Sequence, residues 1–395
     1  MENDFTNINS CEVCGNKDLV DVLNLGSHPL CDDLIQVGDR SVCDEYPIEI
    51  VFCNKCKTAH QKTQISKHIL FKKDYHYRSK VTQVVLDGLK DLVESYLKKK
   101  GKLKGLKVLD IGCNDGGLLD FFKEKGSKTY GIEPSTAALE AGLNHNVIMG
   151  YFDNQNAKTL LNNYGPFDLI TFTNVFAHIE DLPSLLKNIN SIMSDKTTLI
   201  IENHYLVNIL QKNHFDTFYH EHPRTYSFSS FKYIAKKLNR NISGFEFTGR
   251  DGGDIRVFIS NEKSCKDLIE DVDFFELFKK MNRNLIDWKI SKLCELGLYF
   301  KTYGTLPAKA FPGRATILVK LLGLTEHNIS AVYEIKGSIK TGYYLPGTRI
   351  PILPQSELFK EVNQKPIINF AWHIPLAVRK NLIKNKYFAP VIDIK

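Results

Sequence analysis

The feature that most constrains the fold is a regular alternation of two kinds of segment between residues 107 and 203. Short runs rich in β-branched and aromatic residues, such as "LKVLDIG", "KTYGIEP", "FDLITFTN" and "TTLIIEN", are typical of buried strands. The stretches between them place apolar residues at helical spacing. Strands that alternate with helices in this way form a parallel sheet with helices on both faces. We therefore predict a doubly wound α/β domain.

Four of the nine cysteines form two C-x-x-C pairs, Cys11 and Cys14 in "CEVC" and Cys53 and Cys56 in "CNKC". The second pair follows an apolar run, "IEIVF", as it would in a zinc-ribbon hairpin. Two such pairs supply four thiolates for a tetrahedral Zn²⁺ and leave no open coordination position. We predict a structural zinc ion and no zinc-bound catalytic water.

The length indicates several domains, because 395 residues exceed one ordinary domain and 43% of them are hydrophobic. We place a zinc-binding module at 1–75, the doubly wound domain at 76–265 and a smaller α/β domain at 266–395. Within the second domain, residues 80–100 predict an amphipathic helix, and "IRVFIS" predicts an antiparallel strand at the end of the sheet.

The charge pattern favours a site for small anionic molecules over a nucleic-acid surface. The net charge of +7 comes from scattered lysines without interleaved aromatic residues, so no nucleic-acid surface is predicted. The start, "MENDFTNINS", lacks the features of a signal peptide, and no apolar run reaches the roughly 20 residues of a membrane span. We expect a cytoplasmic protein without membrane contact, either a monomer or a weak homo-oligomer.

A glycine-rich turn in "VLDIGCNDGGLLDFF" follows the first predicted strand of the doubly wound domain. Its glycines let the backbone pass close to a ligand, and Glu133 in "YGIEPS" ends the next strand, where a carboxylate can hold both hydroxyls of a ribose. The turn is not the G-x-G-x-x-G of dinucleotide enzymes. It resembles motif I of class I S-adenosylmethionine (SAM) methyltransferases, with Glu133 as the acid of motif II. The cofactor-binding residues that this resemblance implies are Asp110, Gly112, Asn114, Gly116, Glu133, Asp153, Asn154 and Asn174.

A second set of polar residues lies in "DTFYHEHPRTYSF" and in "NVFAHIEDL". These segments, together with "DIGCNDGGLL", "GIEPS", "DGGDIRVF" and "YLPGTRIPI", occur in this order in the sugar C-methyltransferases, which the whole chain resembles. Those enzymes methylate C3 of nucleotide-linked 4-keto-6-deoxy sugars in deoxysugar biosynthesis, for example in antibiotic and lipopolysaccharide sugar pathways. The resemblance implies the same SAM-dependent reaction here, on a sugar linked to dTDP or GDP.

The resemblance also implies roles for individual residues. His222 is expected to be the general base, Glu221 to orient it or share its proton, and Tyr219 and His178 to hydrogen-bond the C4 oxygen or an adjacent hydroxyl. Tyr75 or Tyr77 is expected to cap the sugar. His220, which faces away from His222 if the segment is extended, is expected to be structural.

The nucleotide is expected to bind in the C-terminal domain. "AFPGRATIL" resembles a phosphate-binding turn that opens a helix. The implied substrate-binding residues are Arg314, Thr316, Lys336, Ser338 and Lys340. Several positions depart from the family pattern, among them "PRTY" after HEH and Asp254 in "DGGDIRVF".

Three other functions remain open from the sequence. A sugar O- or N-methyltransferase would use the same cofactor but would need no enolate. A zinc-containing RNA methyltransferase would show the steep salt dependence of nucleic-acid binding. An inactive sugar-nucleotide-binding module would consume no SAM.

Overall fold

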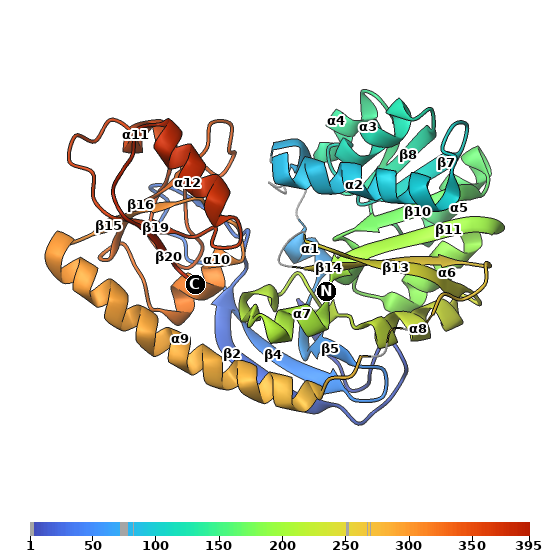
Figure 1. Ribbon diagram of the computed structural model, residues 1–395, viewed down its shortest axis with the longest axis horizontal. Coiled ribbons are helices and arrows are strands. Elements are labelled where there is room, and N and C mark those ends of the chain that lie inside the picture. The colour runs from blue at the N-terminus through green and yellow to red at the C-terminus, as the bar shows by residue number, and fades with distance from the viewer. Residues whose placement is uncertain (1–3, 72–77, 82, 250–252, 267, 269) are drawn as a thin grey trace. The chain divides into compact units, whose positions relative to one another are not determined.

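The computed structural model describes residues 4–71, 78–81, 83–249, 253–266, 268 and 270–395 (Figure 1). The chain divides into two compact units. Unit 1 comprises Met1–Asp21, Val51–Ile209 and Glu221–Phe274, and unit 2 comprises Val22–Ile50, Leu210–His220 and Phe275–Lys395. The boundaries predicted near residues 75 and 265 stay predictions.

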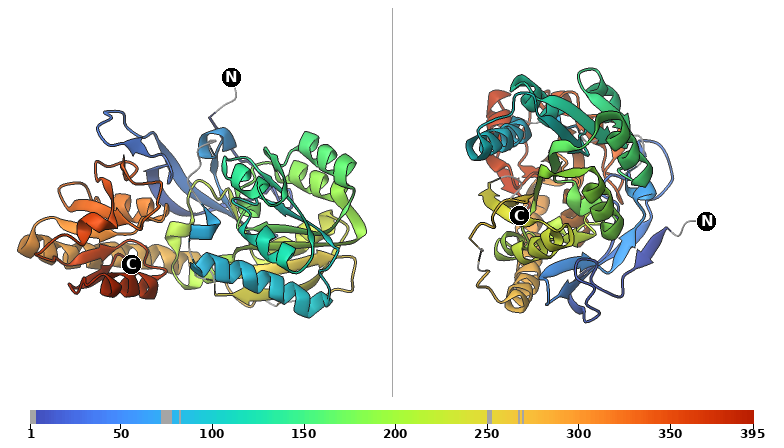
Figure 2. Two further views of the ribbon diagram at one scale, coloured as in Figure 1. Left: turned by 90° about the horizontal axis from the view of Figure 1, so that it is seen from above. Right: turned by 90° about the vertical axis from the view of Figure 1, so that its right-hand side faces the viewer.

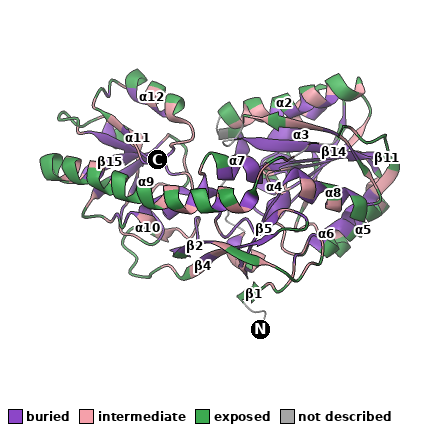
Figure 3. Ribbon diagram, turned by 60° about the horizontal axis from the view of Figure 1, so that its bottom comes forward, coloured by how far each residue is buried: buried purple, intermediate pink, exposed green. Residues whose placement is uncertain are grey.

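Unit 1 is built on a seven-stranded sheet with the order β13-β14-β11-β10-β7-β8-β9. The predicted doubly wound sheet is confirmed: its first five strands in the chain pair in parallel, and most residues of its central strands are buried (Figure 3). Its strands are β7 (Lys107–Ile111), β8 (Lys128–Glu133), β9 (Asn146–Met149), β10 (Phe167–Thr173), β11 (Met193–His204), β13 (Asn241–Thr248) and β14 (Asp254–Ser260).

One expectation about this sheet is wrong. The segment "IRVFIS" lies in β14, which is antiparallel as predicted but is not the last strand, because β13 pairs outside it. The run "NISGFEFT" that forms β13 contains a glycine and polar residues at alternate positions, as suits an edge strand with one exposed face.

Helices cover the sheet of unit 1 on both faces (Figure 2). The predicted amphipathic helix is α2, which buries Leu89, Leu92 and Val93 against α3 and the strands, in one core with Leu169 and Ile200. The helices are α1 (Lys67–Leu70), α2 (Gln83–Lys100), α3 (Gly117–Glu124), α4 (Ala137–Gly142), α5 (Asn154–Tyr164), α6 (Leu182–Ile192), α7 (Leu206–Gln211) and α8 (Phe228–Lys237), with 3₁₀ turns η1 (Ser79–Val81) and η2 (Phe176–His178). A further 3₁₀ turn, η3 (Phe215–Thr217), belongs to unit 2.

The N-terminal part of the chain contributes short antiparallel strands. β4 ends at Cys53, and the turn that follows leads into β5, so the second C-x-x-C pair sits on a hairpin as predicted. β5 pairs on its other side with β12, which directly follows the HEH segment. The strands are β1 (Phe5–Asn7), β2 (Val20–Pro29), β3 (Ile35–Gln36), β4 (Glu45–Cys53), β5 (Thr58–Gln61), β6 (Thr63–Ile65) and β12 (Arg224–Thr225).

Unit 2 contains a five-stranded parallel sheet with the order β18-β16-β15-β19-β20, which agrees with the α/β character predicted for the C-terminal region. Among the described residues, no helix is both long and apolar enough to span a membrane, α9 included. The elements are α9 (Phe274–Tyr303), β15 (Leu306–Lys309), α10 (Ala315–Leu321), β16 (Ile329–Glu334), β17 (Tyr343–Tyr344), β18 (Ile352–Pro354), α11 (Gln355–Leu358), β19 (Ile367–Asn369), α12 (Pro375–Lys384) and β20 (Val391–Asp393).

Candidate active site

The glycine turn between β7 and α3 forms a close backbone cradle. Gly112 has φ +75°, and a Cβ placed there would lie 2.6 Å from the Cγ2 atom of Val175. Asn114, two residues later, also has a positive φ of 49°. The turn lies beside the point where the order of the sheet reverses, since β8 lies on one side of β7 and β10 on the other. Open α/β sheets bind their ligands at this point, outside the carboxyl ends of the strands.

Two buried carboxylates stand at these strand ends. Asp110 accepts a hydrogen bond from the Thr171 hydroxyl at 2.7 Å, and its burial raises the pKa of the carboxyl to about 7. Glu133 accepts hydrogen bonds from the backbone N–H groups of Asn114 at 3.1 Å and Ser135 at 2.9 Å. These bonds fix the carboxylate of Glu133 at the end of β8 and leave lone pairs for further donors.

This cradle fits a nucleoside cofactor such as SAM. A glycine turn that no side chain could occupy lets a ligand approach the backbone, and the fixed acid of Glu133 can accept hydrogen bonds from ribose hydroxyls. Asn174 directly follows β10 with φ +54°, and its backbone N–H donates to the Glu202 carbonyl at 2.8 Å. Asp153 is exposed and caps α5 by accepting from Asn156 N–H at 2.8 Å, with Asn154 as the first residue of that helix. Contact of these last two residues with the adenine stays a prediction.

The predicted catalytic residues of unit 1 lie together. The rings of His178 and His222 are 4.8 Å apart between centroids and meet edge to face. His178 Nδ1 lies 3.9 Å from a carboxylate oxygen of Glu221, too far for a hydrogen bond, and has no hydrogen-bond partner among the described residues. Burial, and then the charge on His204, lower the pKa of His178 to about 3, so this imidazole is neutral at physiological pH.

A fourth member of this cluster, His204, is the last residue of β11, and no motif in the sequence pointed to it. Its ring centroid is 5.2 Å from that of His222. His204 Nδ1 lies 2.6 Å from Asp254 Oδ1, and the other oxygen of Asp254 accepts from the Asn174 amide at 3.1 Å. The pairing of β11 with β14 places His204 opposite Asp254, which a pattern within one segment cannot reveal.

Arg224 connects this cluster to the N-terminal cysteine module. Its buried guanidinium forms an ion pair with Glu12 at 2.7 Å and donates to the Tyr226 hydroxyl at 2.9 Å. It also donates to the carbonyls of Ile179 and Glu180, which directly follow His178 in the chain. Arg224 therefore holds the loop that carries His178.

The four predicted zinc ligands form one cluster. The sulfur atoms of Cys11, Cys14, Cys53 and Cys56 all lie within 4.8 Å of one another, with Cys11 and Cys56 3.3 Å apart and Cys14 and Cys53 3.6 Å apart. Four cysteine sulfurs at this spacing, three of them on buried residues, suit a tetrahedral Zn²⁺. His60 stands beside the cluster, with Nε2 3.3 Å from Cys11 Sγ, as an outer partner of that ligand.

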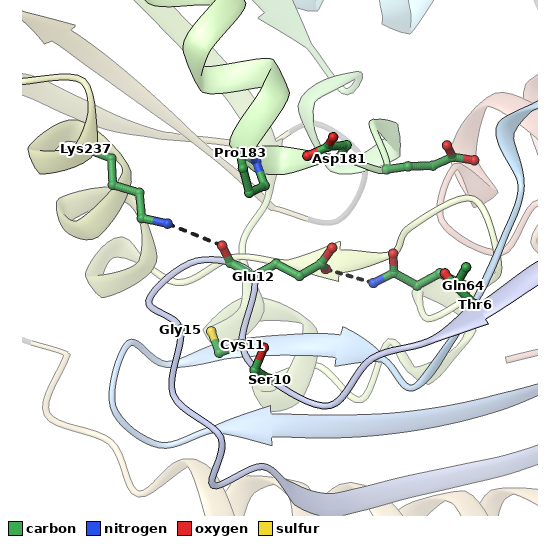
Figure 4. A pocket seen from close by; sticks show the side chains of 10 residues that line it. Thr6, Ser10, Cys11, Glu12, Gly15, Gln64, Asp181, Pro183 and Lys237 are labelled. Atoms are coloured by element: carbon green, nitrogen blue, oxygen red, sulfur yellow. Dashed lines mark hydrogen bonds between the residues drawn. The ribbon is translucent and has the colours of Figure 1, made fainter.

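A pocket of about 510 Å³ lies next to this cluster (Figure 4). Glu12 crosses it, bonded to the Gln64 amide at 2.8 Å and, through its carbonyl, to Lys237 at 3.4 Å. The pocket is lined by Thr6, Ser10, Cys11, Glu12, Gly15, Gln64, Glu180, Asp181, Pro183 and Lys237. Within the described part of the chain, the predicted catalytic and cofactor residues lie outside this lining.

The first histidine of the HEH segment, His220, and Tyr219 before it belong to unit 2, whereas Glu221 and His222 belong to unit 1. His220 Nε2 lies 3.0 Å from the carbonyl of Tyr46, and the ring is buried, which agrees with a structural role. Residues 220 and 221 form a turn, so the extended segment, on which the opposite facing of His220 and His222 was conditional, is not observed. Tyr219 is half-buried and precedes this turn.

The predicted phosphate turn of unit 2 surrounds an internal charge cluster. Arg314 Nε donates to the fully buried Asp216 at 2.7 Å, and Lys395 Nζ contacts the same carboxylate at 2.6 Å. Trp372 donates its indole N–H to Asp216 at 3.0 Å and also stacks under the Arg314 guanidinium, 5.0 Å away. The two cations hold the pKa of Asp216 well below its usual range despite burial.

The remaining predicted substrate residues differ in exposure. Thr316 is 1% exposed and its hydroxyl has no partner among the described residues. Lys340 Nζ lies 3.8 Å from Asp32 and 4.9 Å from the Phe311 ring centroid, whereas Lys336 is exposed and Ser338 half-buried. Tyr75 and Tyr77 lie outside the described residues. Contact of all these residues with a substrate stays a prediction.

Comparison with known proteins gives three family models along the chain. They are described as "Putative zinc binding domain" over residues 11–71, "Methyltransferase domain" over 77–242 and "C-methyltransferase C-terminal domain" over 250–386. The C-methyltransferase NovU of Streptomyces niveus is 26% identical over 64% of this chain, which spans 60% of that protein. A ubiquinone biosynthesis O-methyltransferase of Coxiella burnetii is 27% identical over 24% of this chain and 41% of its own length.

Among solved structures, magnesium protoporphyrin IX methyltransferase of Synechocystis with bound SAM matches 47% of this chain and 87% of its own, with 16% identity and a TM-score of 0.34. The sheet order, the glycine turn and the methyltransferase model define unit 1 as a class I SAM methyltransferase fold. The cofactor of this fold is SAM, and the zinc module adds a site of four cysteines. A zinc-binding model precedes this domain and a C-methyltransferase C-terminal model follows it, and the chain spans 60% of the length of the C-methyltransferase that it matches.

Proposed function

We propose that this protein adds a methyl group to C3 of a nucleotide-linked 4-keto-6-deoxyhexose, with dTDP or GDP as the nucleotide, in deoxysugar biosynthesis. The observation that carries the proposal is the cluster of His178, Glu221 and His222 near the end of β10, in the unit that holds the SAM-type turn. The match to a C-methyltransferase of Streptomyces niveus supports transfer to carbon.

A carbon acceptor explains why a base is needed. The hydrogen on C3 is acidified by the neighbouring C4 ketone, and His222 removes it, so that the C3–H electron pair forms a C3–C4 double bond and the C4 oxygen becomes anionic. SAM, when bound, supplies an electrophilic methyl group for this carbon. A positioned base contributes typically ~10²–10⁴-fold to such a proton transfer. Glu221 then orients the base or shares its proton.

The C4 oxygen needs hydrogen-bond donors as its charge develops. His178 suits this role because its pKa of about 3 keeps the ring neutral, so it donates an N–H without giving up a proton. A neutral ring has a single N–H, so the proposal requires the tautomer with its proton on Nδ1, the nitrogen that has no hydrogen-bond partner among the described residues. Tyr219 is the second proposed donor, and Tyr75 or Tyr77 the proposed cap on the sugar.

The nucleotide diphosphate is proposed to bind unit 2. Arg314 and Lys395 place two cations around the single carboxylate of Asp216, so this cluster carries an excess positive charge when both are protonated. Thr316, Lys336, Ser338 and Lys340 are the other proposed contacts. Calorimetric titration with dTDP and GDP tests this part separately from catalysis, and absence of binding by both would contradict it.

The main alternative is oxygen methylation, which the match to a ubiquinone biosynthesis O-methyltransferase supports. The deciding experiment separates it from carbon methylation. A panel of dTDP- and GDP-linked 4-keto-6-deoxyhexoses is incubated in D₂O with enzyme and S-adenosylhomocysteine, and mass spectrometry follows deuterium uptake at C3. Uptake is expected for an enolate mechanism and not for O-transfer. With SAM, the same panel should show one added methyl group on carbon.

His222→Ala should lower both deuterium uptake and methyl transfer by roughly 10² or more while SAM affinity is retained. His327→Ala, at an exposed histidine of unit 2, is the matched control and should have no effect. Near-normal turnover of His222→Ala would remove His222 from the mechanism.

A further inference from the structure

The cluster of histidines at the end of β11 contains one residue with a different electrostatic environment from the others. Asp254 is fully buried, and its carboxylate lies 2.6 Å from His204 Nδ1. A buried carboxylate favours the charged form of a partner within hydrogen-bond distance, because an unpaired charge there would be costly. The contact therefore favours the imidazolium form of His204.

The position of Asp254 is fixed from two sides. It is the first residue of β14 and pairs in register with His204, the last residue of β11. Its second oxygen accepts from the side-chain amide of Asn174, whose backbone has φ +54°. Asn174 thus uses a sparsely populated conformation to complete the anchoring of Asp254, as is common at functional sites.

The ring of His204 faces the proposed base. The rings of His204 and His222 meet edge to face with centroids 5.2 Å apart, and His178 lies 4.8 Å from His222 on another side. The titratable groups that these contacts bring toward His204 are Asp254 of β14, His222 of the segment before β12 and His178 of η2. A charge on His204 disfavours protonation of both neighbouring histidines, which agrees with the low pKa of His178.

We propose that His204, held protonated by Asp254, is the fixed positive charge of the reaction site and stabilises the anionic oxygen that forms when the acceptor is deprotonated. This inference rests on the proposed C-methylation. It adds to that proposal a division of the three histidines, with His204 as a cation and His178 and His222 as neutral rings. Groups whose environments separate their protonation states in this way are typical of paired acid and base roles. No redox step or further reactant is needed: the proton leaves carbon for His222, and His204 keeps its own.

Two variants test the pair. Asp254→Asn retains a hydrogen-bond acceptor but removes the charge, and Asp254→Glu restores it. Turnover of whichever 4-keto sugar nucleotide the wild type methylates should fall roughly 10²-fold in Asp254→Asn, with SAM affinity unchanged, and should recover in part in Asp254→Glu. Glu246→Gln, which makes the same change in a carboxylate of the adjacent strand β13, is the control and should keep turnover.

The pH profile separates this role from a structural one. Activity requires His204 to be protonated, so the rate should fall at high pH, and this alkaline limb should move to lower pH by about one unit or more in Asp254→Asn. A residue that only supports the fold would lower the rate without moving the limb. An unmoved limb, or equal turnover in Asp254→Asn and Glu246→Gln, overturns the proposal.

An NMR titration with ¹³C-labelled histidine makes the test independent of the acceptor. The His204 signal, assigned by its loss in His204→Gln, should be that of an imidazolium at pH 7 in the wild type and should titrate at lower pH in Asp254→Asn. A neutral His204 at pH 7 overturns the inference whatever the enzyme methylates. Absence of methylation with every sugar, alongside a protonated His204, instead contradicts the proposed function and leaves the ion pair established.

Discussion

Arg224→Met is expected to destabilise the protein severely, because it removes one partner of a buried ion pair. The Arg224 side chain is fully buried and that of Glu12 is 19% exposed, and their charged atoms lie 2.7 Å apart. Loss of one partner from such a pair costs about 3–5 kcal/mol, since the other charge stays behind. The carbonyls of Ile179 and Glu180 and the Tyr226 hydroxyl lose a donor as well.

The assay must report on unit 1. The two tryptophans, Trp288 and Trp372, lie in unit 2, so urea unfolding should be followed by far-UV circular dichroism in parallel with tryptophan fluorescence. The matched control is Arg240→Met, whose carboxylate partner, Asp195, is 3.8 Å away and 93% exposed. The Arg240 side chain is itself 12% exposed, but the carboxylate that it leaves behind is hydrated, so loss of this pair should cost about 0–1 kcal/mol.

The reasoning also predicts coupling and an effect on activity. In a double-mutant cycle, Glu12→Gln should cost much less in the Arg224→Met background than in the wild type, because the pair is already broken. Turnover should fall because the loop after His178 loses its clamp, while SAM binding is retained. A loss of stability no larger than that of Arg240→Met, or an additive cycle, would refute the proposed clamp.

Three further predictions follow from the cofactor cradle, the buried acid and the zinc cluster. Gly112→Ala should weaken SAM binding, measured by calorimetry, roughly tenfold or more, because its Cβ would lie 2.6 Å from Val175 and overpacking costs about 1–3 kcal/mol. The control Gly142→Ala should bind SAM normally, because a Cβ at that position would meet no atom within 4 Å. Burial raises the pKa of Asp110 to about 7, above its unfolded value of about 3.9, so the free energy of unfolding should fall as pH rises from 4 to 7 and then level off. Asp110→Asn should lose this pH dependence when urea unfolding is compared at pH 5 and pH 8. An unchanged pH dependence in this variant would exclude Asp110 as its source. Cys53→Ser should reduce bound zinc, measured by mass spectrometry of the metal, from about one ion per chain to nearly none and should unfold the β4–β5 hairpin; full zinc content in this variant would contradict the four-cysteine site.

The local elements of this protein could be predicted from its sequence alone. The strand and helix patterns between residues 107 and 203 depend on periodicity within each segment, and the glycine turn and C-x-x-C pairs depend on spacing within a few residues. Such signals are local, because they reflect which side of one element is buried and which backbone conformations a residue permits. They sufficed for the doubly wound sheet, the SAM-type turn and the zinc ligands.

The partners of the buried charges were decided only by the tertiary structure. His204 meets Asp254 because β14 runs antiparallel to β11 in one particular register, and Arg224 meets Glu12 because β12 pairs with β5. The order and register of strands far apart in the chain leave no periodic signal in either strand, since they are set by which surfaces bury one another. The sequence therefore provided the chemical groups, and the packing of distant strands determined which of them became ion pairs.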